Sequence, residues 1–128
     1  MINTSSNFYT NQTTFGTTKK QFKKMFKVCS YSDEKFENGD TITIEHIIPQ
    51  SRGGDIHDKT NQIGVKRSWN MKRSSLMLKF FEEDCPNLAE NIRKTVKAME
   101  GVIVDGKNWA EEVKPKFIEE FGRNIFKK

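Results

Sequence analysis

The sequence is short of histidine and cysteine, and these shortages exclude several kinds of enzyme. It has 2 histidines and 2 cysteines in 128 residues. No cysteine lies near either histidine, and a catalytic zinc normally needs three protein N, O or S ligands, so zinc hydrolysis is less favoured. Nothing resembles a nucleophile elbow or a cysteine-histidine signature of covalent catalysis. Cys29 and Cys85 are far apart in sequence, and we expect them to be free thiols that pack as small hydrophobes.

Long hydrophobic runs are also absent. No segment approaches the roughly 18 apolar residues of a membrane span, and the N-terminal segment has neither a basic end nor an apolar stretch for secretion. We therefore expect an intracellular, cytoplasmic protein with no membrane partner.

The composition predicts one domain with a polyanionic partner. With 34% hydrophobic residues, the chain can bury one modest core, so we expect a single domain over residues 1–128. The formal charge of +5 suits nucleic acid, although such a surplus is also common among ordinary soluble proteins. Residues 15–80 carry 13 Lys or Arg against 7 Asp or Glu, whereas residues 81–128 carry 9 against 10. The basic surplus therefore lies in residues 15–80.

The N-terminal part predicts a loose arm followed by a basic helix. Residues 1–16 are rich in Ser, Thr and Asn and predict a loosely ordered arm. Residues 19–28 have the apolar spacing of a helix, with Thr17 or Thr18 as its cap and lysines over the rest of its surface. Such lysines usually form a solvated face, but contact with nucleic-acid phosphates is the alternative.

The rest of the chain predicts two strands and several helices. An extended run ending at Phe36, a turn over residues 38–40 and a β-branched run over 41–48 predict a hairpin. A helix is expected after Ser68, following a glycine-containing loop. Amphipathic helices follow over residues 84–128, and Pro115 should interrupt the last of them.

The acid-histidine pair Glu45 and His46 is the first candidate site. Carboxylate and amide oxygens, here Glu45, Asn61 and Asn70, are hard ligands suited to magnesium. An imidazole beside such an ion is a plausible general base for activating water, which is the chemistry of phosphodiester hydrolysis. Adjacent strand residues point to opposite faces, so we expect the strand to bend or end near Pro49. A lone histidine after a strand is most often structural.

The stretch "EHIIPQSRGG", then Asn61, then "KRSWNMKRSS" resembles the HNH, or ββα-metal, nuclease motif. The motif has an acid-His pair, a proline step, a Ser/Gly-rich loop, a middle Asn and a final His or Asn on a helix. The variant ending in Asn, here Asn70, is similar to the HNH domain of RNA-guided CRISPR nucleases. The resemblance covers about a third of the chain.

The resemblance implies a role for each matching residue. His46 would be the general base, and Glu45 and Asn70 would bind one divalent ion, Mg²⁺ or alternatively Mn²⁺. Asn61 would hold the loop and so orient the histidine. Lys72 or Arg73 would hold the scissile phosphate or stabilise its charge. Further contacts to nucleic acid are expected from basic residues near the site and on the first helix, namely Arg52, Lys66, Arg67, Lys23 and Lys24.

The chain departs from the family at the structural zinc site. Many members have two Cys-x-x-Cys pairs, and the corresponding positions here are Cys29 with Ser32 and Lys66 with Trp69. One cysteine out of four cannot hold zinc, so we expect no structural zinc and expect Trp69 to fill the space. Glu45 also stands where Asp is common, which keeps the charge and changes the ligand's reach.

We therefore predict an α+β protein with a ββα-metal core over residues 28–82 and a helical extension over 84–128. The predicted activity is metal-dependent hydrolysis of DNA, with duplex DNA as the expected substrate, by nicking or double-strand cleavage; cutting both strands would require two sites and hence a homodimer. One alternative is a nucleic-acid-binding or assembly module without turnover. Another is a nuclease toxin held by an inhibitor protein. His57 is expected to be a surface or loop-stabilising residue.

Overall fold

A computed structural model describes residues 16–127 as a small α+β fold. Except for Gly16, the expected N-terminal arm lies outside this range. Two antiparallel two-stranded sheets occur among the described residues. The elements in chain order are helix α2 (Lys19–Lys24), strand β1 (Ile42–His46), the 3-10 turns η1 (Gln50–Arg52) and η2 (Lys59–Asn61), strand β2 (Gln62–Lys66), helices α3 (Arg67–Arg73), α4 (Leu78–Phe81) and α5 (Leu88–Ala98), strands β3 (Ile103–Val104) and β4 (Lys107–Asn108), and helix α6 (Trp109–Phe121).

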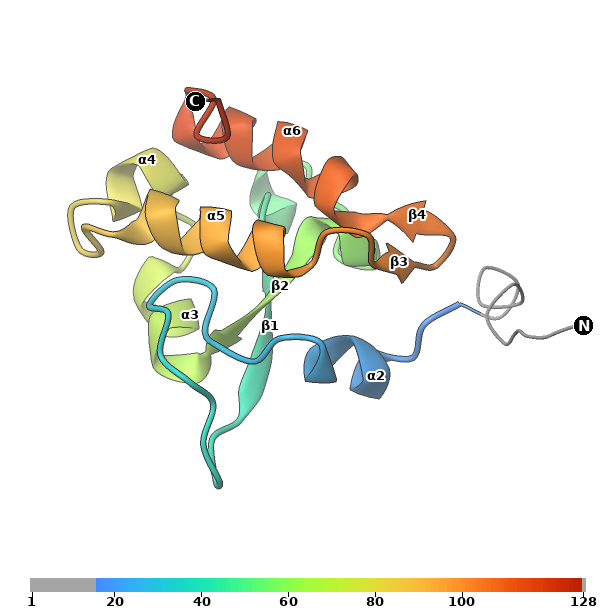
Figure 1. Ribbon diagram of the computed structural model, residues 1–128. Helices are drawn as coiled ribbons and strands as arrows, with labels where there is room; N and C mark the ends of the chain where they lie inside the picture. Colours follow the sequence, from blue (N-terminus) through green and yellow to red (C-terminus); the bar gives the residue numbers. More distant parts are fainter. Residues whose placement is uncertain (1–15, 128) are drawn as a thin grey trace, which may run out of the picture.

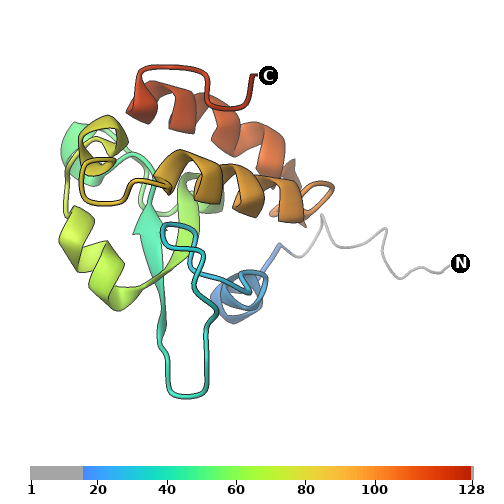
Figure 2. The same cartoon turned by 60° about the vertical axis from the view of Figure 1, so that its left-hand side comes forward.

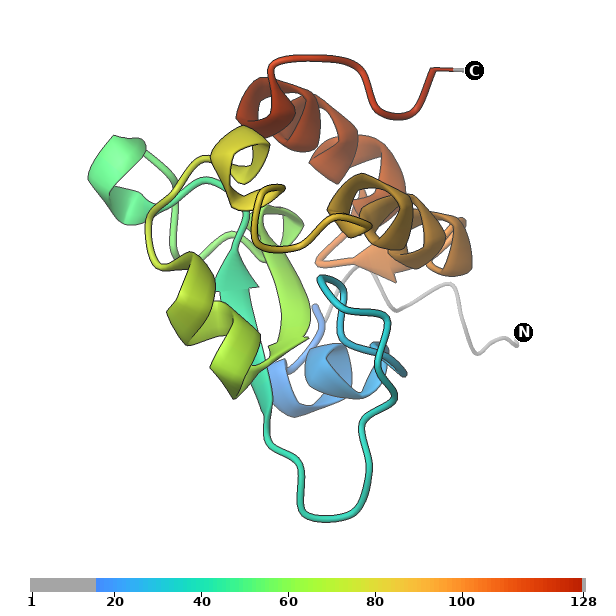
Figure 3. The same ribbon diagram turned by 90° about the vertical axis from the view of Figure 1, so that its left-hand side faces the viewer.

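Strand β1 pairs with β2, and the two form the centre of the molecule (Figure 1). Their register places Ile44 opposite Gly64 and His46 opposite Gln62. Helix α3 begins directly after β2, so the chain runs strand, loop, strand, helix. Helices α2 and α3 lie on opposite sides of this sheet (Figure 3). The site residues are therefore divided between two faces.

The predicted hairpin partner of β1 was wrong. Residues before Phe36 contribute only an isolated bridge between Val28 and Lys35, and Asp33, with a φ of 64°, turns this segment back on itself. The connection that follows projects away from the body (Figure 2). The true partner, β2, is buried along four of its five residues and contains Gly64, so it shows no alternating pattern. A Cβ on Gly64 would lie 2.7 Å from the Phe26 ring, which explains the glycine.

Helix α2 has the predicted cap but is shorter than expected. Thr18 and Gln21 form a capping box, in which each side chain bonds to the backbone N–H of the other residue. The helix ends at Lys24, although Phe26 beyond it is still buried. Phe22 and Phe26 pack edge to face, with ring centroids 5.2 Å apart. This aromatic pair fastens α2 to the core beside β1.

The C-terminal helices α5 and α6 lie at the end of the molecule opposite the connection that leads into β1 (Figure 1). Helix α5 buries the predicted stripe that includes Leu88, Ile92 and Val96. Helix α6 runs through Pro115 without the expected interruption. Pro115 is exposed, and the burial of residues on the opposite face, such as Trp109 and Phe117, offsets the lost hydrogen bond.

One cluster of buried hydrophobic side chains forms the core, and its members run from Phe22 in α2 to Ile125 beyond α6. Cys29 and Cys85 are free thiols within it, as predicted. None of the helices in residues 16–127 has the length and apolar character to cross a membrane.

Candidate functional site

Strand β1 sends Glu45 and His46 to opposite faces. We expected the strand to bend or end near this pair, and β1 does end at His46, but its pairing with β2 still includes His46 opposite Gln62. The Ile47 N–H then donates to the Asn61 carbonyl at 2.9 Å, so the chain turns only after the histidine. Since side chains alternate along a regular strand, the carboxylate and the imidazole do not face each other. The two residues are joined by a hydrogen bond from the His46 backbone N–H, and not from its ring, to Glu45 Oε1 at 3.1 Å.

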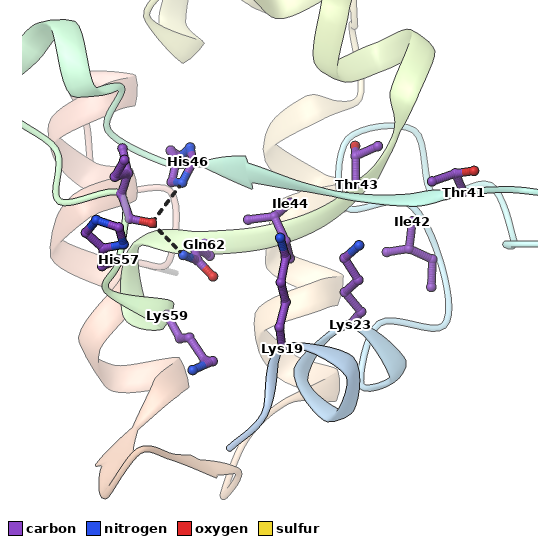
Figure 4. A pocket seen from close by; sticks show the side chains of 11 residues that line it. Lys19, Lys23, Thr41, Ile42, Thr43, Ile44, His46, His57, Lys59 and Gln62 are labelled. Atoms are coloured by element: carbon purple, nitrogen blue, oxygen red, sulfur yellow. Dashed lines mark hydrogen bonds between the residues drawn. The ribbon is translucent and has the colours of Figure 1, made fainter. Parts of the chain in front are cut away.

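The His46 imidazole is held by a backbone carbonyl. Its Nε2 lies 3.2 Å from the Ile56 carbonyl oxygen, and Gln62 Nε2 donates to the same oxygen at 2.9 Å (Figure 4). A carbonyl oxygen only accepts hydrogen bonds, so in the neutral ring this contact places the proton on Nε2. Nδ1 is then the nitrogen that accepts a proton.

Asn61 holds the loop that supplies this carbonyl. Its side chain is buried, accepts from the Ile48 N–H at 2.9 Å, and donates to the carbonyls of Ile48 at 3.0 Å and Asp55 at 3.2 Å. Gly54 allows the loop to close, because a Cβ there would lie 1.7 Å from the Ile48 oxygen. Asn61 therefore acts on His46 through the loop and not by direct contact.

Glu45 is buried on the face of β1 that α3 covers. Its Oε2 accepts from the Tyr31 hydroxyl at 2.8 Å and lies 3.5 Å from Arg73 Nη1. Burial raises the pKa of Glu45, while Arg73 and Tyr31 act in the opposite direction. Burial and the Glu45 carboxylate likewise raise the pKa of Tyr31, so its hydroxyl stays protonated as a donor.

Arg73 has no exposed surface, and its guanidinium is fully occupied by protein groups. It donates to the carbonyls of His46 at 2.8 Å and Ile47 at 3.0 Å, and to Glu120 Oε1 at 2.6 Å. A side chain in this position holds the backbone that follows the histidine and does not reach a substrate phosphate. Lys72, the other residue predicted for the phosphate, is exposed, with Nζ 5.1 Å from the centre of the Trp69 ring.

Asn70 lies on the Glu45 side of β1. Its Nδ2 donates to Thr43 Oγ1 at 3.1 Å and to the Ile44 carbonyl at 3.2 Å. The amide oxygen makes no hydrogen bond to any residue in the range 16–127, so it is available to a cation. Glu45 Oε1 accepts a single hydrogen bond, from His46, and keeps acceptor capacity. This donor pair fits the oxygen chemistry of Mg²⁺.

No three His, Cys, Asp or Glu side chains cluster at metal-binding distance anywhere in the described part of the chain. The predicted ligand pair contains one carboxylate and one amide, so it does not form a cluster of that kind. Protein ligands to Mg²⁺ are often this few, because the ion keeps several waters.

A groove lies on the His46 face of β1 and has a volume of about 510 Å³. Its floor contains Ile42 and Ile44, and His46 and His57 line one end (Figure 4). No acidic side chain occurs among the described residues that line it. The cations of the groove are Lys19 and Lys23 from α2 and Lys59 from the loop.

The sequence analysis identified only some of these cations. Of the two lysines predicted on the first helix, Lys23 lines the groove and Lys24 does not. Lys19 was missed, although its spacing of four residues from Lys23 was a signal for a shared helix face. Lys59 was also missed, because its approach to α2 depends on the fold.

The other predicted nucleic-acid contacts lie outside this groove. Arg52 pairs with the buried Glu120 and donates to the Ser75 carbonyl at 3.0 Å. Lys66 Nζ lies 3.6 Å from the Asp40 carboxylate. Arg67 is exposed at the start of α3.

The four positions that correspond to the family's zinc ligands come together in space. The Lys66 N–H donates to Cys29 Sγ at 3.3 Å. Glu34 Oε1 accepts from the Ser32 hydroxyl at 2.6 Å and from Trp69 Nε1 at 2.9 Å. These hydrogen bonds connect the Cys29 turn to the start of α3. Trp69 also packs edge to face on Phe81, with ring centroids 6.2 Å apart.

Comparisons of the chain with protein-family models, with curated proteins and with solved structures gave no match.

Proposed function

We propose that the chain is a metal-dependent endonuclease of the HNH, ββα-metal type that hydrolyses phosphodiester bonds in DNA. This proposal rests on the hydrogen bond that His46 makes and on the charge of the groove around it. The Ile56 carbonyl fixes the proton on Nε2 and leaves Nδ1 as a base, in a groove whose lining within residues 16–127 includes three lysines and no acidic side chain. A base in a cationic groove suits an anionic substrate.

Two further observations support the resemblance to this family. The order strand, loop, strand, helix is the order that a ββα-metal core requires, with the histidine at the end of β1 and Asn70 on α3. The turns that would carry zinc in other members meet through hydrogen bonds of Cys29 and Glu34. Neither contact was used in recognising the motif.

In the proposed reaction, His46 Nδ1 takes a proton from a water molecule as the water oxygen attacks phosphorus. The bond from phosphorus to the 3′ oxygen breaks, which leaves a 5′ phosphate and, after protonation, a 3′ hydroxyl. Glu45 and Asn70, on the other face of β1, would hold one Mg²⁺ or Mn²⁺ ion, whose chemistry is electrostatic stabilisation of the charge that develops on a phosphate. The substrate must therefore reach both faces where β1 ends at His46. Lys72, which is exposed on α3, would be the cation that holds the scissile phosphate or stabilises its charge.

The test is incubation of the purified protein with supercoiled plasmid in Mg²⁺, in Mn²⁺ and in chelator. The proposal predicts nicked or linear product with either metal and none with chelator. The product ends are then examined by ligation, which requires a 5′ phosphate and a 3′ hydroxyl. Cleavage that persists in chelator would contradict the metal-dependent mechanism.

A nucleic-acid-binding module without turnover is the second candidate, and the pairing of Glu45 with Arg73 favours it. A cation already 3.5 Å from Glu45 Oε2 competes with a metal for that carboxylate. This candidate predicts binding of DNA that weakens steeply with salt, and an intact plasmid with every divalent ion. The plasmid experiment therefore separates the two candidates.

A further inference from the structure

The groove beside His46 extends along β1 away from the histidine and is lined by lysines. Its floor follows β1 from Ile42 to His46. At about 3.3 Å per residue this stretch is roughly 13 Å long. A floor of this length can hold a short stretch of one nucleic-acid strand with more than one phosphate.

One wall of the groove is helix α2, which lies outside the strand, loop, strand, helix unit. Lys19 and Lys23 are one helical turn apart and reach from α2 toward β1 (Figure 4). Side chains at this spacing share a face, with about 5–6 Å between their Cβ atoms. Neither lysine forms a salt bridge with any residue in the described range 16–127, so their charges are not neutralised there.

The third lysine, Lys59, lies on the wall of the groove opposite α2 and forms an ion pair. Lys59 Nζ is 3.0 Å from Asp105 Oδ2, so the carboxylate in the β3–β4 turn partly neutralises its charge. Ile42 and Ile44 give the floor an apolar surface between the two walls. Apolar floor and cationic wall are the features that contact the sugars and the phosphates of one nucleic-acid strand.

We propose that one DNA strand lies along this groove, and that Lys19 and Lys23 bind successive phosphates on one side of the phosphate that His46 attacks. Helix α2 is then a substrate-holding element that sets which phosphate lies at the histidine. The inference rests on the proposed nuclease function for the identity of the substrate. It assigns the binding to Lys19 and Lys23, and not to the helix's lysines in general.

The same helix supplies a matched control. Lys20 and Lys24 are exposed, carry the same charge and do not line the groove. The two double variants, Lys19→Ala with Lys23→Ala and Lys20→Ala with Lys24→Ala, therefore lose the same net charge from the same six-residue helix. Alanine has a higher helix propensity than lysine, so both variants should keep α2. Circular dichroism checks that they do.

The experiment is fluorescence anisotropy of a labelled DNA duplex in chelator, over a range of salt concentrations, so that no cleavage occurs. Each phosphate contact contributes about 0.9 to the slope of log affinity against log salt. Loss of the Lys19 and Lys23 contacts should lower the slope by about 1.8, which corresponds to about 60-fold weaker binding at 0.1 M salt if affinities are equal at 1 M. The Lys20 and Lys24 variant should keep most of the slope.

Equal losses in the two variants, or an unchanged slope in the groove variant, would overturn the assignment. Lack of DNA binding by the unmodified protein would overturn it as well. Failure of the proposed function has a different signature, because the unmodified protein would then bind DNA with the predicted slope and leave plasmid intact in Mg²⁺ and Mn²⁺.

Discussion

Glu120 on α6 should contribute strongly to stability through its contact with Arg73. It has no exposed surface and accepts from Arg73 Nη2 at 2.6 Å, from both terminal nitrogens of Arg52, and from the Leu78 N–H at 3.3 Å. The substitution Glu120→Gln keeps the shape and removes the charge. Arg73 would then remain buried with Glu45 as its only acidic neighbour, at 3.5 Å.

Removing one partner of a buried ion pair typically costs 3–5 kcal/mol, because the other charge stays buried without compensation. Arg73 keeps Glu45, so we expect the lower end of that range, about 3 kcal/mol. Domains of this size are stable by roughly 5–15 kcal/mol, so such a loss should lower the melting temperature by about 10 °C. Urea unfolding followed by circular dichroism gives the free energy directly.

The chain provides a control for this prediction at its surface. Glu82 accepts from both terminal nitrogens of Arg123, at 2.8 and 2.7 Å, but the Arg123 side chain is 52% exposed. The substitution Glu82→Gln should therefore cost at most about 1 kcal/mol. A Glu120→Gln variant no less stable than Glu82→Gln would refute the importance of the buried pair.

Three further predictions concern other contacts. Hydrogen bonds from the Ser32 hydroxyl and from Trp69 lower the pKa of Glu34 from its ordinary 4.5. The Glu34 carboxylate therefore stabilises the fold above that pH, and this contribution is lost as the pH falls. Glu34→Gln should be less stable than the unmodified protein at pH 7, and unfolding at several pH values should show that the difference shrinks in acid. Gly64→Ala should cost about 1–3 kcal/mol in urea unfolding, because the new Cβ meets the Phe26 ring. Gln62→Met removes the amide donor to the Ile56 carbonyl, and should slow plasmid cleavage by up to about tenfold, the worth of one hydrogen bond, as the rate of plasmid nicking in Mg²⁺ will show.

The sequence allowed the α+β class, a strand within residues 41–48, a cap at Thr17 or Thr18 and the C-terminal helices to be predicted. These features have local causes, namely β-branched runs, capping residues and apolar stripes. Strand β2 was missed because its residues are almost all buried and Gly64 lies at its centre. A buried strand without alternation has no pattern that distinguishes it from a loop or a short helix segment.

The loop contacts of Asn61 were predictable from the sequence, but the arrangement of the other predicted site residues was not. Asn61 was expected to hold the loop, and its three hydrogen bonds to Ile48 and Asp55 do so. The burial of Arg73 was not predictable, because its partner Glu120 lies 47 residues away on α6. The groove likewise depends on contact between α2 and β1, which no sequence pattern encodes.

Plasmid cleavage in Mg²⁺ by His46→Ala, compared with His57→Ala, tests whether His46 is the general base. Both histidines line the same groove, so the second variant controls for the loss of an imidazole from it. The account predicts that His46→Ala lowers the cleavage rate by about 10²- to 10⁴-fold, the usual contribution of a general base, and that His57→Ala retains most of the activity. Cleavage by His46→Ala at the rate of the unmodified protein would contradict it.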